Sequence, residues 1–111
     1  DGAKIDIITN DGWTPLKKAC YDNSIEIIKL LLDSKANINF ADKDGYTPLY
    51  IASQKGHKEV VEVLIRLGAK IDLAKTDGYT PLYIASEKGH KEVVELLIRL
   101  GANINIILND G

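Results

Sequence analysis

Residues 44–49 read Asp-Gly-Tyr-Thr-Pro-Leu, and the same hexapeptide begins 33 residues later at Asp77 and 33 residues earlier at Asp11, where Trp13 replaces the tyrosine. The period extends well beyond the hexapeptide. Residues 44–76 and 77–109 are identical at 25 of 33 positions, and residues 11–43 follow the same frame more loosely. A fixed period of this size is typical of a stacked repeat array, so we expect function to reside in a surface built by repetition.

The repeat frame also predicts the organisation of the chain as one domain over residues 1–111. Gly2-Ala-Lys-Ile-Asp-Ile7 aligns with Gly68-Ala-Lys-Ile-Asp-Leu73, and Asp110-Gly111 has the form of the opening of a further repeat. The expected units are the tail of a preceding repeat at 1–8, full repeats at 9–41, 42–74 and 75–107, and the start of another at 108–111. We therefore expect a piece of a longer array, and the high identity between repeats fits either recent duplication or engineering.

The sequence of each repeat predicts two short helices and a projecting loop. Thr47 supplies a capping hydroxyl, and Pro48 follows at the helical position where its missing N–H costs nothing. Gly56 and Gly68 stand where a left-handed residue ends each helix, and His57 opens the second helix. Helices of two to three turns are unstable alone in water, so they must stack on their neighbours. The expected fold is an all-α solenoid.

The loops and the buried faces follow from the same pattern. Asp77-Gly78 predicts a tight turn in a hairpin-like connection between repeats. In the second helix of the middle repeat the apolar face is expected to comprise Val60, Val61, Leu64 and Ile65.

The two ends of the array differ in sequence. Lys17 and Lys18 replace the Tyr-Ile of later repeats, which predicts a polar outer face and a partial cap at the first repeat. Lys35 replaces a helix-ending glycine, at a cost of about 1 kcal/mol for positive φ. In the third repeat no apolar position of the pattern is replaced by a polar residue in this way. We therefore expect an uncovered apolar side there, extended by Ile104, Ile106, Ile107 and Leu108.

Taken together these residues resemble the ankyrin repeat. Asp-Gly-x-Thr-Pro-Leu, Ala, Gly-His, Glu-Val-Val-Glu, Leu-Ile and Gly-Ala recur in register with that family's pattern, and the match covers essentially the whole chain. The family's histidine after Thr-Pro-Leu is replaced by Lys17, Tyr50 and Tyr83, so its hydrogen bonding between repeats is not carried over unless a tyrosine hydroxyl substitutes. The resemblance implies a non-catalytic module that binds a protein partner through its loop tips and the concave face of its first helices.

Carried over position by position, the resemblance places the partner-binding residues along one edge of the array. They are Asn10, Asp11, Trp13, Tyr21 and Asp22 in the first repeat, Lys43, Asp44, Tyr46, Gln54 and Lys55 in the second, and Thr76, Asp77, Tyr79, Glu87 and Lys88 in the third. Trp and Tyr are enriched among binding hot spots, although tyrosine at this place also packs on its own loop. Trp13 and Tyr21 are favoured because they break the repeated pattern.

The sequence indicates no catalytic, metal or cofactor site. His57 and His90 occupy equivalent places in helices about 8–10 Å apart, too far for one metal ion to bind both. Cys20 aligns with small residues, which predicts a buried thiol. The periodic aspartates open Asp-Gly turns, where that residue is locally favoured, so turn chemistry explains them.

The amino-acid composition limits which classes of partner are expected. The net charge of −2, from 14 basic and 16 acidic residues, gives no reason to expect nucleic acid or a membrane as a partner. A single cysteine fits a reducing compartment, so we expect an intracellular, cytoplasmic location. In the ankyrin family, loop asparagines with a leucine eight residues upstream resemble substrates of an asparaginyl hydroxylase. Asn39 and Asn105 match that spacing, although both are also ordinary loop positions of the repeat.

Three functional hypotheses remain open from the sequence. The leading one is a protein-interaction module without catalysis. The second is a structural unit that self-assembles through the C-terminal repeat, either as a back-to-back dimer or as a head-to-tail stack, since a large exposed apolar patch marks an interface. The third is a regulatory or targeting domain whose catalytic part lies outside these residues.

Overall fold

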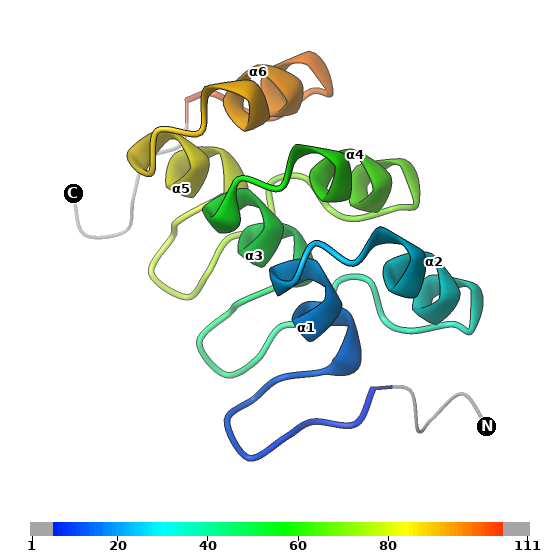
Figure 1. The fold of residues 1–111 in the computed structure, drawn as a ribbon. Coiled ribbons are helices and arrows are strands. Elements are labelled where there is room, and N and C mark those ends of the chain that lie inside the picture. The colour runs from blue at the N-terminus through cyan, green and yellow to red at the C-terminus, as the bar shows by residue number, and fades with distance from the viewer. Residues whose placement is uncertain (1–5, 106–111) are drawn as a thin grey trace.

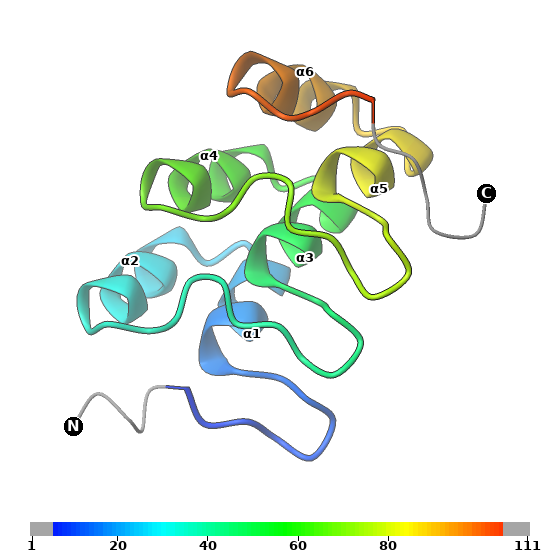
Figure 2. The same ribbon diagram turned by 180° about the vertical axis from the view of Figure 1, so that it is seen from behind.

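A computed structural model describes residues 6–105, which form six α-helices and no β-strand over that range. The helices are α1 (Pro15–Tyr21), α2 (Ile25–Asp33), α3 (Pro48–Lys55), α4 (Lys58–Arg66), α5 (Pro81–Glu87) and α6 (Lys91–Arg99). Helices α1, α3 and α5 stack in one row and α2, α4 and α6 in a second, as Figures 1 and 2 show from the two sides. The expected all-α solenoid is confirmed, with extents of 41 × 27 × 20 Å.

The first helix of each repeat begins as its sequence predicts. The hydroxyls of Thr14, Thr47 and Thr80 accept from the third backbone N–H beyond them at 3.1–3.2 Å, and a proline follows each threonine. Gly56 ends α3 in the left-handed conformation with φ of 76°. In the first repeat, Asn23 and Lys35 adopt positive φ of 61° and 77° where later repeats use glycine. The backbone geometry is thus kept even where the residue that favours it is absent.

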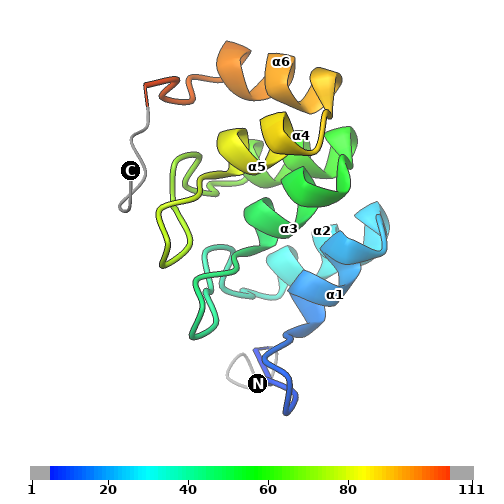
Figure 3. The ribbon, with the colours of Figure 1, turned by 90° about the vertical axis from the view of Figure 1, so that its left-hand side faces the viewer.

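The connections between repeats are hairpin-like loops that project from one side of the stack, as Figure 3 shows. Each loop is closed by a backbone hydrogen bond across its base, from Thr9 to Trp13 at 2.9 Å and from Lys75 to Tyr79 at 2.8 Å. The equivalent bond in the second repeat runs from Asp42 to Tyr46 at 3.3 Å. The Asp-Gly pair at each tip turns the chain, as predicted.

A continuous apolar core runs through the stack between the two rows of helices. Leu16, Leu49, Val61, Leu64 and Leu97 are fully buried within it. The predicted face of α4 is confirmed, except that Ile65 is only partly buried. Each repeat therefore depends on its neighbours for its stability.

Hydrogen bonds link each repeat to the one before it. The ring Nε2 of His57 lies 3.1 Å from the carbonyl oxygen of Tyr21, and that of His90 lies 2.8 Å from the carbonyl oxygen of Gln54. The side chain of Asn39 accepts from the backbone N–H of Lys70 at 2.9 Å. The histidines stand at the helix starts as predicted, but their bonds to the preceding repeat were not predicted.

The prediction that Lys17 caps the end of the array is wrong. Its side chain is buried and faces the second repeat, whereas the neighbouring Lys18 is exposed. The first repeat is not polar on its outer side, because Ile27 and Leu30 are 51% and 66% exposed there. A one-residue step along a helix turns a side chain by about 100°, which separates the two lysines.

The opposite end is also apolar, as the sequence predicted for the third repeat. Tyr83, Ile98 and Ile104 are exposed there, at 36%, 50% and 63%. The predicted cluster also named Ile106, Ile107 and Leu108, which lie outside the described residues.

Candidate partner-binding site

A buried ion pair joins the first two repeats. Lys17 Nζ lies 3.1 Å from Asp42 Oδ2, and the two side chains are 2% and 17% exposed. The ammonium also donates to the Tyr46 carbonyl at 3.4 Å, while Asp42 Oδ1 accepts from the backbone N–H groups of Asp44 and Tyr46 at 3.0 Å each. Burial alone would raise the pKa of Asp42, but these backbone donors and Lys17 outweigh it and lower that pKa.

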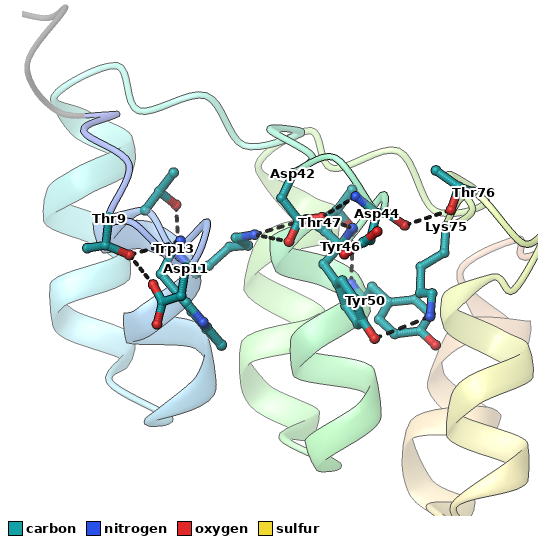
Figure 4. A network of polar contacts seen from close by, with 12 residues as sticks. Thr9, Asp11, Trp13, Asp42, Asp44, Tyr46, Thr47, Tyr50, Lys75 and Thr76 are labelled. Atoms are coloured by element: carbon teal, nitrogen blue, oxygen red, sulfur yellow. Dashed lines mark hydrogen bonds and ion pairs between the residues drawn. The ribbon is translucent and has the colours of Figure 1, made fainter.

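Different chemistry occupies the same place between the second and third repeats. Lys75 Nζ lies 4.4 Å from the ring centroid of Tyr46, 5.5 Å from that of Tyr50 and 5.8 Å from that of Tyr79. It donates to the Tyr46 hydroxyl at 3.2 Å and pairs with Asp77 at 3.4 Å. Figure 4 shows Asp42 at the first junction and, beside it, Lys75 with Tyr46 and Tyr50 at the second. The tyrosine hydroxyl that accepts from Lys75 between repeats belongs to Tyr46, which precedes Thr-Pro-Leu, and not to Tyr50 or Tyr83, which stand in the place of the family's histidine.

Lys75 and the rings of Tyr46, Tyr50 and Tyr79 form an aromatic cage, in which the pKa values of Lys75 and Tyr50 are shifted. Burial alone would lower the pKa of Lys75, but the hydrogen bond to Tyr46, the charge interactions with Tyr50 and Tyr46 and the hydrogen bond to Asp77 together outweigh it, and the pKa is raised. Burial raises the pKa of Tyr50 to about 12, although the Lys75 charge acts in the opposite direction. Lys75 is therefore protonated and Tyr50 un-ionised near neutral pH.

An aromatic pair lies at the base of each hairpin loop. The rings of Trp13 and Tyr21 meet edge to face with centroids 5.5 Å apart, and those of Tyr46 and Tyr50 do so at 5.3 Å. The pair in the third repeat is Tyr79 and Tyr83, at 4.5 Å. Trp13 and Tyr46 also pack against the core, so both rings are held in place.

Three hollows meet around the first hairpin loop. The end groove, about 720 Å³, opens on the outer side of the first repeat and is lined by Ile7, Thr9, Asp11, Trp13, Thr14, Pro15, Lys18 and Tyr21. The tip groove, about 400 Å³, is lined by Ile8, Thr9, Asn10, Asp11, Gly12, Phe40, Ala41, Asp42, Lys43 and Asp44. The junction groove, about 310 Å³, is lined by Asp11, Trp13, Lys17, Tyr21, Asp42, Asp44, Tyr46, Ile51 and Gln54. Asp11 lines all three.

Comparison with known proteins identifies the family of this array. The sequence profile for ankyrin repeats in three copies matches residues 1–75 and 39–107. The chain belongs to the ankyrin repeat family. Ankyrin repeats generally mediate interactions between proteins and are typically non-catalytic.

A curated ankyrin repeat protein is similar to part of this chain. The ankyrin repeat protein FPV031 of fowlpox virus (strain NVSL) is 55% identical to it over 42 residues. The match covers 37% of this chain and 12% of the viral protein, so the chain spans a small part of that relative's length.

The ankyrin frame brings most of the residues predicted for the first two repeats together. Asp11, Trp13, Tyr21, Asp44, Tyr46 and Gln54 share the junction groove, and Asn10 and Lys43 line the tip groove. Lys55 lies beside them, with its Nζ 4.5 Å from the Tyr21 ring, and Asp22 pairs with Lys18 at the end of α1. The predicted residues of the third ankyrin repeat, Thr76, Asp77, Tyr79, Glu87 and Lys88, line none of these three grooves.

Sequence reasoning missed Lys17, Asp42 and Lys75 as members of this surface. All three stand where the ankyrin repeats of this chain differ from one another, and Lys17 and Asp42 have opposite charges. The opposite charges could have been noticed in the sequence. The ion pair between Lys17 and Asp42 can be predicted, however, only when the side chain at position 17 is known to face the following repeat.

The cysteine thiol and the possible metal ligands of the described residues form no reactive site. Cys20 is fully buried, as predicted, and burial raises the pKa of its thiol to about 12, so the thiol is un-ionised at neutral pH. Within residues 6–105 no group of three or more His, Cys, Asp or Glu side chains is arranged to hold a metal ion. In the same part of the chain, no helix is long and apolar enough to span a membrane.

Proposed function

We propose that this ankyrin array is a non-catalytic interaction module that binds a protein partner through the hairpin tips and the concave face formed by α1, α3 and α5. The observation that carries the proposal is the junction groove, where Trp13, Tyr21 and Tyr46 lie beside the carboxylates of Asp11 and Asp44. Aromatic side chains bury large areas at little cost in conformational entropy, and they dominate many interfaces. An intracellular site of action remains a prediction.

The rings differ in how well each one suits a test of binding. Trp13 and Tyr46 pack against the core, so truncating either side chain also affects stability. Tyr21 is 42% exposed and is therefore the cleaner probe. Leu67, exposed at the end of α4, supplies a control for loss of an exposed apolar side chain away from the groove.

Tyr21→Ala and Trp13→Ala are expected to weaken the partner by about tenfold or more, the effect of losing a hot spot. The partner would be captured from the source cell, identified and purified, and its affinity measured by isothermal titration calorimetry. Leu67→Ala should leave that affinity unchanged. Circular dichroism checks that each variant is folded at the assay temperature. Equal affinity for all three variants would rule out this surface.

A second candidate function is supported by the apolar ends of the stack. Ile27 aligns with Val60, which is fully buried beneath the first repeat, and Ile98 aligns with the partly buried Ile65. The third repeat of one molecule therefore offers the first repeat of another the same type of surface that pairs repeats internally. Such a head-to-tail contact is open-ended and would build filaments.

Leu30→Lys is expected to abolish any concentration-dependent assembly, because it puts a charge on the apolar end face, one helical turn from Ile27. Multi-angle light scattering over a wide concentration range measures the assembly state. Leu67→Lys, which makes the same change in the middle of the stack, should assemble like the unmodified chain. A monomer at all concentrations would exclude self-assembly.

A further inference from the structure

The second junction of the array shows how this fold holds a cation. Lys75 inserts its ammonium among the rings of Tyr46, Tyr50 and Tyr79 and pairs with Asp77. Cation–π attraction and a carboxylate favour a positive charge at this place, and the chain supplies the charge itself.

The first junction keeps two of the three aromatic positions, Trp13 and Tyr46, and lacks the equivalent lysine. One repeat earlier, the position of Lys75 is Asp42, and the position of Tyr50 is Lys17. Lys17 turns toward Asp42 and the Tyr46 carbonyl, 5.6 Å from the Trp13 ring. The groove beside this pair stays open, with a volume of about 310 Å³.

The charges that line this groove do not balance. Three carboxylates and one ammonium line it, and Lys17 and Asp42 compensate each other. Asp11 and Asp44 are exposed, and neither takes part in an ion pair among the described residues. Within residues 6–105 the Asp11 carboxylate accepts only a local hydrogen bond, from the Thr9 hydroxyl.

Four lysines lie near the rings of this groove and limit where a further cation can enter. Lys17 Nζ lies 5.6 Å from the Trp13 ring centroid and is paired with Asp42. Lys75 Nζ lies 4.4 Å from the Tyr46 ring centroid and is paired with Asp77. Lys55 Nζ lies 4.5 Å and Lys18 Nζ 5.6 Å from the Tyr21 ring centroid. These charges repel a cation at the Tyr21 side of the groove. The favourable approach is therefore from the hairpin tips, where Asp11 and Asp44 also line the tip groove.

We propose that the junction groove binds an arginine side chain from a basic segment of the protein partner, with its guanidinium between the Trp13 and Tyr46 rings and its charge facing Asp11 and Asp44. The inference rests on the proposed interaction function and specifies the chemistry of the partner. A planar guanidinium is suited to this place, because it stacks on aromatic faces and donates to carboxylates at the same time.

The chain offers a direct probe, because Trp13 is its only tryptophan. Trp13 fluorescence would be followed during titration with the peptide acetyl-Gly-Ser-Arg-Ser-Gly-amide and with the same peptide carrying citrulline, which is neutral and of similar shape. We expect saturable binding of the arginine peptide with a dissociation constant of about 1 mM, and binding of the citrulline peptide weaker by about tenfold. Equal responses to both peptides, or no saturable response to either, would overturn the proposal.

Matched charge variants locate the binding. Asp11→Asn with Asp44→Asn should weaken the arginine peptide about fivefold or more, since two carboxylates lose their charge. Asparagine keeps the oxygen that accepts from Thr9 and suits both turns. Glu26→Gln with Asp33→Asn makes the same change in net charge on α2 and should alter the affinity less than twofold. Equal weakening by both double variants would mean non-specific attraction and would refute the groove as the site.

The peptide titrations and the partner-binding measurements can fail independently of each other. If Trp13→Ala weakens the purified partner while the arginine peptide gives no saturable response, the interaction surface stands and the arginine assignment is wrong. If the arginine peptide binds as expected and the partner is unaffected by Tyr21→Ala and Trp13→Ala, the groove has the proposed chemistry but is not the partner's docking surface.

Discussion

Gly45→Ala is expected to lower the free energy of unfolding by about 3–4 kcal/mol, as measured by urea denaturation at neutral pH. Gly45 adopts φ of 90°, which costs a residue with a side chain about 1–2 kcal/mol. A Cβ atom there would also lie 2.7 Å from both Lys75 Cα and Thr76 N. Those are backbone atoms of the next hairpin, so relief requires the two loops to separate, and such overpacking adds about 1–3 kcal/mol.

Gly12→Ala is the matched control for this substitution. Gly12 occupies the same turn position with φ of 87°, but its added Cβ would meet only the Asp42 side chain at 3.5 Å or more. We expect a loss of about 1–2 kcal/mol, from backbone strain alone. Equal losses in the two variants would show that the contact between neighbouring hairpins contributes nothing to stability.

The helices and turns of this array are predictable from sequence because their causes are local. The threonine that caps α3 and the proline after it are adjacent in sequence, and the glycine of each tip turn is set by its own φ. Repetition adds to this, because a signal that recurs at a fixed period cannot be an accident of composition. The same argument holds for the family, because the hexapeptide and the Gly-His, Glu-Val-Val-Glu and Gly-Ala motifs recur in one register.

The contacts between repeats are not predictable in the same way. Lys17 was expected on the outer side because the repeat frame distinguishes apolar from polar positions, but not the side facing the preceding repeat from the side facing the next. Its partner Asp42 stands 25 residues away, in another repeat. The bonds of His57 and His90 are missed for the same reason, since each ends on a backbone carbonyl that has no sequence signature.

The candidate binding surface is predictable from sequence in part: its aromatic residues are, but the contact between repeats that shapes it is not. Trp13 and Tyr21 were favoured because they break the repeat pattern, and they line the same groove. The depth and charge of that groove depend on Lys17 pairing with Asp42 instead of projecting outward. Exchanging these two residues for the tyrosine and lysine of the next junction would recreate the occupied cage around Lys75. Two substitutions therefore separate an open groove from a filled one.

Asp42→Asn is expected to destabilise the chain by about 2–3 kcal/mol in urea denaturation at neutral pH. The amide oxygen can still accept from the backbone N–H groups of Asp44 and Tyr46, so the turn is preserved. The amide nitrogen would replace the oxygen that faces Lys17 and cannot accept from an ammonium. Lys17 would then be a buried charge with only the Tyr46 carbonyl as partner, a change that costs about 3–5 kcal/mol at full burial and less beside an open groove.

The pH dependence of this loss identifies the charge as its cause. The pKa of Asp42 is lowered in the folded chain, so its contribution is complete above the unfolded value of about 3.9 and fades as the pH falls through the folded value. The difference between the unmodified chain and Asp42→Asn should therefore be constant from about pH 5 to 7 and shrink below about pH 4. Asp22→Asn removes the exposed partner of Lys18 on the same helix and should cost less than about 0.5 kcal/mol. A loss from Asp42→Asn that persists undiminished at low pH would mean that packing, and not the ion pair, holds the first two repeats together.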